Sequence, residues 1–155
     1  MRTVNSLPAP EECNCFAVRA AARHVSQSYD RFLAPTGLRT TQYSILARLK
    51  RKGPLTINTL AEDMVMDRTT LGRNILPLQR DGLITIKSAA SDRRAKELRL
   101  TKAGEKRLQE AFEGWSQAQA RFEAAFGGKR AADLRTLLRT AAASEFAPGT
   151  QSANR

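Results

Sequence analysis

The sequence predicts a mainly α-helical fold with a small two- or three-stranded β element. Over most of the 155-residue chain, apolar residues recur at three- and four-residue steps, the period of an amphipathic helix. Between residues 83 and 100 the period changes to the alternation typical of β-strands. No repeat or low-complexity linker interrupts residues 13–146, so we expect them to form one continuous unit between disordered tails at 1–12 and 147–155.

The chain is strongly basic, with 26 Lys and Arg against 15 Asp and Glu and a formal net charge of +11. This balance favours polyanionic partners, with nucleic acid first and an anionic membrane surface second. No apolar run approaches the ~20 residues that a bilayer span needs, so a membrane protein is excluded. Two cysteines and no apolar signal segment lead us to expect a reduced, cytoplasmic protein rather than a disulfide scaffold.

Three helical patterns fill the first half of the chain. They cover about residues 13–33, 41–52 and 56–64, and Pro or Gly residues separate them. Thr56 is a suitable N-cap for the third pattern, which is short. These helices precede a fourth one that differs from them in having a polar, basic side.

The fourth helix is expected from Asp67, a good N-cap, to Asp81, with Gly82 as its stop. Steps of about 100° per residue divide its side chains between two faces. The apolar face holds Leu71, Ile75 and Leu78. The opposite face holds Thr69, Thr70, Arg73, Pro77 and Arg80, with Leu76 at its edge. A helix of this kind packs on one side and presents groups for base edges and phosphates on the other.

A β-ribbon follows this helix. Residues 83–87 and 96–100 are predicted to pair as antiparallel strands, and the loop between them is polar and carries Asp92, Arg93 and Arg94. Residues 67–107 hold eleven bases and five acids, a net charge of +6. Helices followed by a ribbon with a basic tip are typical of a winged helix-turn-helix, in which one helix enters the major groove of DNA.

Seven residues are therefore candidate DNA contacts. They are Arg68, Thr69, Thr70, Arg73 and Asn74 on the fourth helix, and Arg93 and Arg94 on the wing. The alternative interpretation is a solvated basic face, or a structural protein that binds nucleic acid through charge alone and without sequence preference.

Four segments of the sequence resemble the MarR family of bacterial transcriptional regulators. They are residues 67–73 (DRTTLGR), 78–84 (LQRDGLI), 92–94 (DRR) and 100–104 (LTKAG). The resemblance implies a homodimer on a pseudo-palindromic operator, commonly as a repressor that a small ligand or an oxidant releases. It also implies that Asp92 holds Arg94 in position, and that Thr69, Thr70 and Arg73 contact DNA.

Residues 38–101 would then form the winged-helix DNA-binding domain, and residues 13–34 and 102–146 the dimerisation helices. The late helices carry more apolar surface than a small wing domain could cover, which also favours a dimer. Their apolar residues include Phe112, Trp115, Phe122, Phe126, Leu134, Leu137 and Leu138.

Two switches are compatible with the sequence. The first is a ligand pocket between the dimerisation helices and the wing domain, where the family commonly binds aromatic acids or phenolic ligands. Its candidate lining is His24, Tyr29, Tyr43, Met64, Met66 and Trp115, although such residues at helical spacing are also ordinary core.

The second switch is oxidation of a thiol. Cys15-Phe-Ala17 is similar to the sensing cysteine of the organic-peroxide branch of the family, with Cys13 as a second possible redox residue and Tyr29 at the spacing of the branch's first tyrosine. The branch's second tyrosine is replaced here by Thr40. The alternative is that Cys15 is a small buried apolar residue in a dimer interface.

The sequence contains little that would indicate an enzyme or a metal site. No phosphate-binding, nucleophile-elbow or zinc-protease motif is present, and His24 is the sole histidine. Cys13, Cys15 and His24 lack a second pair of ligands for zinc. We therefore expect no catalytic residues, no metal and no cofactor.

Overall fold

The computed structural model describes residues 7–146, so most of the expected tails at 1–12 and 147–155 lie outside the described residues. The chain divides into two compact units, Met1–Gln119 and Ala120–Arg155. None of the described helices is long and apolar enough to cross a membrane.

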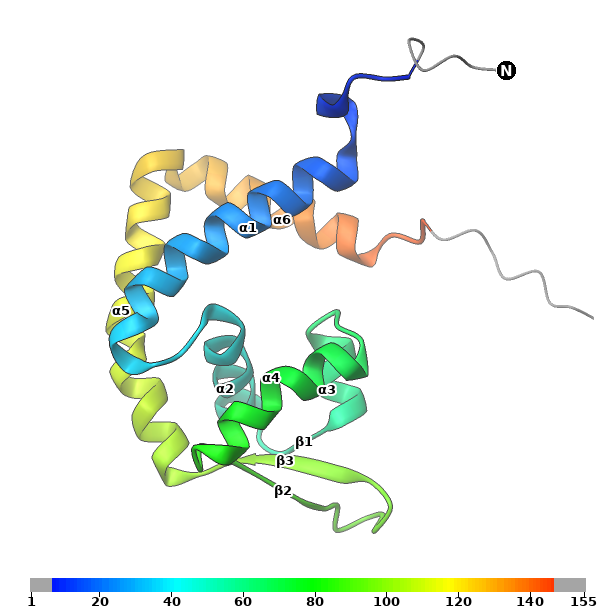
Figure 1. Ribbon diagram of the computed structural model, residues 1–155, viewed down its shortest axis with the longest axis vertical. Helices are drawn as coiled ribbons and strands as arrows, with labels where there is room; N and C mark the ends of the chain where they lie inside the picture. The colour runs from blue at the N-terminus through cyan, green and yellow to red at the C-terminus, as the bar shows by residue number, and fades with distance from the viewer. Residues whose placement is uncertain (1–6, 147–155) are drawn as a thin grey trace, which may run out of the picture. The chain divides into compact units, whose positions relative to one another are not determined.

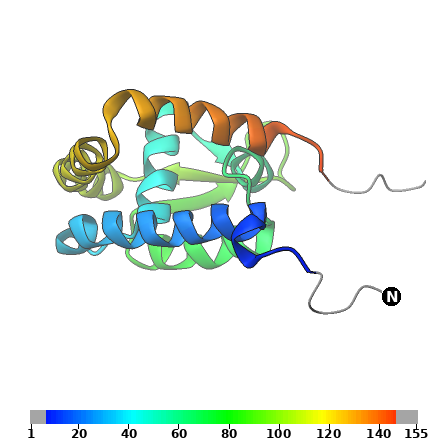
Figure 2. The ribbon, with the colours of Figure 1, turned by 90° about the horizontal axis from the view of Figure 1, so that it is seen from above.

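The first unit contains the helices α1 to α4 (Figure 1). Their bounds are α1 Asn14–Leu33, α2 Thr40–Lys52, α3 Ile57–Asp63 and α4 Arg68–Arg80. α1 is one unbroken helix in both views (Figures 1 and 2). A short 3-10 turn at Pro10–Glu12 leads into it, within the segment expected to be a tail. The predicted caps of α3 and α4 are confirmed, because Thr56 and Asp67 each accept a hydrogen bond from the backbone N–H three residues later.

Three short strands form one antiparallel sheet in the order β1-β3-β2. They are β1 Leu55–Thr56, β2 Ile84–Ser88 and β3 Lys96–Leu100. In the ribbon, Ile84 lies opposite Leu100 and Ser88 opposite Lys96. β1 adds two residues to the other edge of β3. The helices and this sheet make the winged helix-turn-helix that the sequence predicts.

The core of the first unit lies between α2, α3, α4 and the sheet. Leu46, Leu60, Leu71 and Leu98 are fully buried there. Each comes from a different element, so this core fixes α4 against its neighbours and leaves the opposite side of α4 in solvent.

α5, Lys102–Phe126, begins in the first unit and continues into the second. Thr101 caps it, accepting from the Gly104 N–H at 3.0 Å while donating to the Gly82 carbonyl at 2.6 Å. Gly104 and Gly114 allow close packing in the first unit, since a Cβ at these positions would lie 2.1 Å from the Leu83 carbonyl oxygen and 2.4 Å from that of Phe32.

The second unit contains the end of α5 and all of α6, Gly128–Ala143. Phe122 stacks on Phe126 with ring centroids 5.4 Å apart, and the Arg130 guanidinium lies 4.5 Å above the Phe126 ring. Leu137 and Leu138 on α6 remain exposed. The described part of this unit therefore presents apolar side chains that its own residues do not cover.

Candidate nucleic-acid interface

The start of α4 is held by Asp67 and Thr70. One carboxylate oxygen of Asp67 accepts from the Thr70 backbone N–H at 2.8 Å, and the other accepts from the Thr70 hydroxyl at 2.6 Å. These hydrogen bonds, first that from the hydroxyl and then that from the backbone, hold the pKa of Asp67 below its ordinary value. The Thr70 hydroxyl proton is therefore engaged within the protein, and its oxygen keeps only acceptor capacity for a ligand.

Three candidate residues on α4 face solvent without a protein partner. Arg68, Thr69 and Arg73 are exposed. In the described part of the chain, no side-chain hydrogen bond or ion pair involves them. Both guanidinium groups thus keep all of their donors for an external acceptor, such as a phosphate or a guanine edge.

Asn74 behaves differently from its neighbours. Its side-chain amide donates to the Thr70 carbonyl at 2.9 Å, and the residue is partly buried. Sequence spacing placed Asn74 among the base-reading residues, but this local bond turns the amide back along the helix. The second amide N–H and Oδ1 remain for a ligand, in the orientation that this bond sets.

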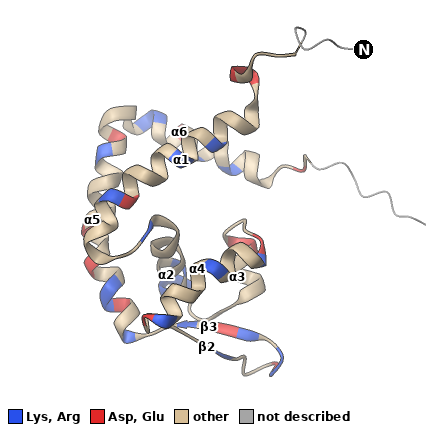
Figure 3. Ribbon diagram, viewed as in Figure 1, with Lys and Arg blue, Asp and Glu red and all other residues tan. Residues whose placement is uncertain are grey.

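The wing tip has its own turn. Asp92 Oδ1 accepts from the Arg94 backbone N–H at 2.9 Å, and the Ala95 N–H donates to the Asp92 carbonyl at 3.1 Å. Asp92 thus holds the backbone of Arg94, whereas the guanidinium groups of Arg93 and Arg94 extend into solvent. Figure 3 shows basic residues on α4 and at this ribbon tip.

An ion-pair cluster braces the helices behind α4. Asp63 at the end of α3 receives Lys52 Nζ at 2.6 Å and Arg48 Nε at 3.0 Å, both from α2. The hydrogen bond from Lys52 is the main cause that lowers the pKa of Asp63, and the charges of Lys52 and Arg48 add to it against the opposing effect of burial. Sequence reasoning missed this cluster, because its partners lie 11 and 15 positions apart.

The residues expected around an effector are mostly packed together as core. Tyr43 stacks on Trp115, which stacks in turn on Phe112, with ring centroids 5.9 Å apart in both pairs. Tyr43 is buried, which raises the pKa of its hydroxyl. Met64 and Met66 pack against the same core. Sequence spacing alone could not distinguish this stack from a ligand pocket.

The remaining effector and redox candidates lie on α1. His24 is exposed, and the Tyr29 hydroxyl donates to Gln119 Oε1 at 2.6 Å. Cys13 and Cys15 are free, exposed thiols, and the Cys13 sulfur accepts from the Phe16 N–H at 3.4 Å as the cap of α1. The described residues contain no group of three side chains suited to hold a metal ion.

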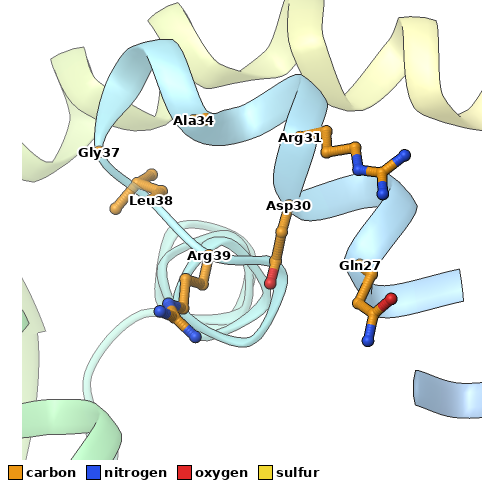
Figure 4. Close-up of a pocket in the computed structure, with 7 residues that line it drawn as sticks. All are labelled: Gln27, Asp30, Arg31, Ala34, Gly37, Leu38 and Arg39. Atoms are coloured by element: carbon orange, nitrogen blue, oxygen red, sulfur yellow. The ribbon is translucent and has the colours of Figure 1, made fainter. Parts of the chain in front are cut away.

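An open hollow of about 470 Å³ lies between α1 and the start of α2 (Figure 4). It is lined by Gln27, Asp30, Arg31, Ala34, Gly37, Leu38 and Arg39. Asp30 accepts from the Thr40 N–H at 2.7 Å and so caps α2. None of the expected effector residues lines this hollow.

Comparison with known proteins agrees with this architecture. The MarR family model matches residues 38–96. The organic hydroperoxide resistance transcriptional regulator of Bacillus subtilis (strain 168) is 29% identical over 90 residues, which are 58% of this chain and 61% of that protein. The chain thus matches about three fifths of that relative's length.

Solved structures match over more of the chain. The transcriptional regulator MosR of M. tuberculosis, in complex with DNA, is 39% identical with a TM-score of 0.73, and the match covers 84% of this chain and 96% of that one. CouR of Rhodococcus jostii RHA1, bound to p-coumaroyl-CoA, has the same fold, with 22% identity, a TM-score of 0.74 and coverage of 92% and 100%. The chain belongs to the MarR family of DNA-binding transcriptional regulators, which are not enzymes.

Proposed function

We propose that this chain is a homodimeric repressor that recognises a pseudo-palindromic operator and leaves it when a small aromatic or phenolic ligand binds. One observation carries the proposal: the outer side of α4 holds Arg68, Thr69 and Arg73 exposed and without partners inside the described protein. Such donors are costly to bury without acceptors, so a polyanionic surface is the natural ligand for this face.

The candidate contacts take different roles. Arg73 lies one turn inside α4, where its two-pronged guanidinium can bind a guanine edge in the major groove. Arg68 is in the first turn and binds phosphate together with the helix N-terminus, while Thr69 reaches a base edge or phosphate. Thr70 contributes as an acceptor, and Asn74 contributes through its Oδ1 and its second amide N–H.

The wing supplies a second contact. Arg93 and Arg94 at its tip bind the DNA backbone or the adjacent minor groove, and Asp92 fixes the turn that presents them. Residues 38–101 act as the DNA-binding domain in this proposal.

A second copy of the chain covers the apolar residues of the dimerisation helices. Three of these side chains are more than half exposed: Phe16 and Val18 on α1, and Leu137 on α6. Burial of these side chains stabilises the dimer, and two-fold symmetry then sets two α4 helices about one DNA turn (~34 Å) apart.

Effector binding is proposed to involve His24, Tyr29, Tyr43, Met64 and Trp115. A protein of this fold, CouR, is bound to p-coumaroyl-CoA, so the fold is compatible with a small-molecule switch. Because Tyr43 and Trp115 stack on each other, a ligand that enters between them must separate the rings. Trp115 is the single tryptophan and would report this by a change in fluorescence.

Peroxide sensing through Cys15 is the alternative switch. Its thiol is free and exposed in the first turn of α1, where a peroxide can reach it. The Tyr29 hydroxyl, however, donates to Gln119. In either case the protein acts in the cytoplasm, where the operator is.

The test is fluorescence anisotropy of the purified protein with DNA from upstream of its own gene, against a scrambled duplex over a salt series. We expect tight, competitor-resistant binding with a steep salt dependence. Where the upstream DNA is not bound, a duplex selected from a random pool takes its place. Equal affinity for selected and scrambled duplexes would identify a non-specific polyanion binder instead.

The same titration tests the dimer. Inserting about half a helical turn (about 5 base pairs) between the half-sites rotates one of them to the far side of the duplex, so specific binding should be lost. Retention of full affinity would contradict symmetric binding by two α4 helices.

A further inference from the structure

Gly72, in the middle of α4, has no explanation within the fold. A Cβ at Gly72 would meet nothing within 4 Å, whereas a Cβ at Gly104 or Gly114 would collide with backbone. Glycine inside a helix is less stable than alanine because it loses more backbone freedom on folding. Gly72 therefore lowers the stability of α4 at a position where alanine would fit.

Leu76 lies one turn further along the same side of the helix, since residues four apart are neighbours on a helix surface. Its side chain is 63% exposed, although α4 buries Leu71, Ile75 and Leu78 on its other side. About 100° per residue places Leu76 next to Thr69 and within one step of Arg73. Gly72 and Leu76 together form a low apolar strip, the Gly72–Leu76 strip, along the edge of the basic face.

We propose that double-stranded DNA covers the Gly72–Leu76 strip. The duplex approaches the α4 backbone closely at Gly72, where no side chain separates them, and the Leu76 side chain packs against a thymine methyl group in the major groove. The inference rests on the proposed function and adds two specificity residues to it.

Charge complementarity selects DNA as the occupant. Arg68 and Arg73 flank the strip and have no ion-pair partner among the described residues, so a protein or lipid that covered the strip would also have to supply several anions in a row. Duplex DNA supplies phosphates on both sides of the major groove, whose floor carries thymine methyl groups among the polar base edges.

The first experiment is Gly72→Ala, which moves two readouts in opposite directions. Thermal unfolding should show Tm raised by about 3 °C, because alanine stabilises the helix in open space. Anisotropy with the selected duplex should show roughly tenfold weaker binding, equivalent to about 1.4 kcal/mol, because the methyl group holds the duplex away. The matched control is Gly128→Ala, an exposed α6 position that is equally open, and it should bind DNA as the wild type does.

The second experiment tests Leu76 with a chemical change in the DNA. Uracil in place of thymine removes the methyl group from the selected duplex. We expect wild type to lose several-fold affinity on this replacement and Leu76→Ala to lose clearly less. Leu76→Ala should keep wild-type Tm, because its side chain is mostly in solvent.

Wild-type selectivity for the selected over the scrambled duplex is measured in the same titration. The inference is overturned, while the proposed function stands, if wild type prefers the selected duplex and Gly72→Ala binds that duplex with the same affinity as wild type. Equal sensitivity of wild type and Leu76→Ala to uracil overturns it in the same way. If wild type shows no preference, both the function and the inference fall.

Discussion

Val65 and Gly82 occupy the same position in two copies of one helix-ending motif. After α3 and after α4, this residue donates to the carbonyl three positions earlier, and the next residue donates to the carbonyl five positions earlier. Both have positive φ, 51° for Val65 and 72° for Gly82. Glycine is the usual residue there, because a β-branched side chain is strained in the left-handed region.

Replacing Val65 with glycine should therefore stabilise the protein. Its side chain is 74% exposed, so little packing is lost. Relief of the strain, less the entropy that glycine costs, should raise the free energy of unfolding by about 0.5–1 kcal/mol. Urea denaturation measures this. Gly82→Val is the reverse control and should destabilise the protein; an unchanged or lowered midpoint for Val65→Gly would contradict the strain.

Gly114→Ala should destabilise the contact between α1 and α5. The added Cβ would lie 2.4 Å from the Phe32 carbonyl oxygen, which belongs to backbone and cannot move aside as a flexible side chain could. The cost should be about 1–3 kcal/mol, read as a lower Tm. Gly128→Ala makes the same chemical change in open space. Equal Tm values for the two variants would mean that α1 does not pack against Gly114 in solution.

Local signals made most of the fold predictable. Asp67, Thr56 and Thr101 are caps whose partners lie three residues away, so the helix starts follow from short segments. The ribbon β2–β3 follows from its alternation and its polar loop. β1 could not be predicted, because two residues acquire strand geometry only by pairing with Leu98 and Glu97 about forty positions later.

The sequence predicted which side of α4 each candidate residue lies on, but it did not predict their hydrogen bonds. Helical periodicity placed Thr70 and Asn74 on the polar side of α4, yet both have a partner inside the helix. The aromatic residues Tyr43 and Trp115 had the spacing of either core or pocket, and three-dimensional contacts alone reveal their stack. The open space beside Gly72 could not be predicted from the sequence, because it depends on which atoms of the folded chain lie within 4 Å of that position.

Stability should depend on pH through Asp63. Because the pKa of this carboxyl is lowered in the folded protein, its contribution is present above the unfolded value, about 3.9, and is lost as pH falls through the lower folded value. Asp63→Asn should lower the free energy of unfolding at neutral pH by about 1 kcal/mol or less, because Lys52 is half-exposed. The gap from wild type should close as pH falls below the unfolded value and through the lower folded pKa of Asp63. A gap that stays constant with pH would contradict a charge-based role.

Cys15→Ser distinguishes the two switches. The side chain lies in solvent on the first turn of α1, so the variant should fold and bind the selected duplex as wild type does. Thiol sensing predicts that a peroxide pulse releases wild type but not the variant from DNA in an anisotropy assay. Equal release of both proteins would remove Cys15 as the sensor and leave Cys13 as the oxidisable thiol. Release of neither protein would leave ligand binding as the switch.

Arg73→Ala should weaken binding to the selected duplex by about 1–3 kcal/mol and narrow the difference between specific and scrambled DNA, because a base-edge contact is lost. Arg94→Ala on the wing is the contrasting variant. It should weaken both duplexes alike and reduce the slope of log K against log salt by about one, as expected for one lost phosphate contact. Both side chains are exposed, so folding should be unaffected. Wild-type affinity and selectivity in Arg73→Ala would show that DNA is read from another face of the protein.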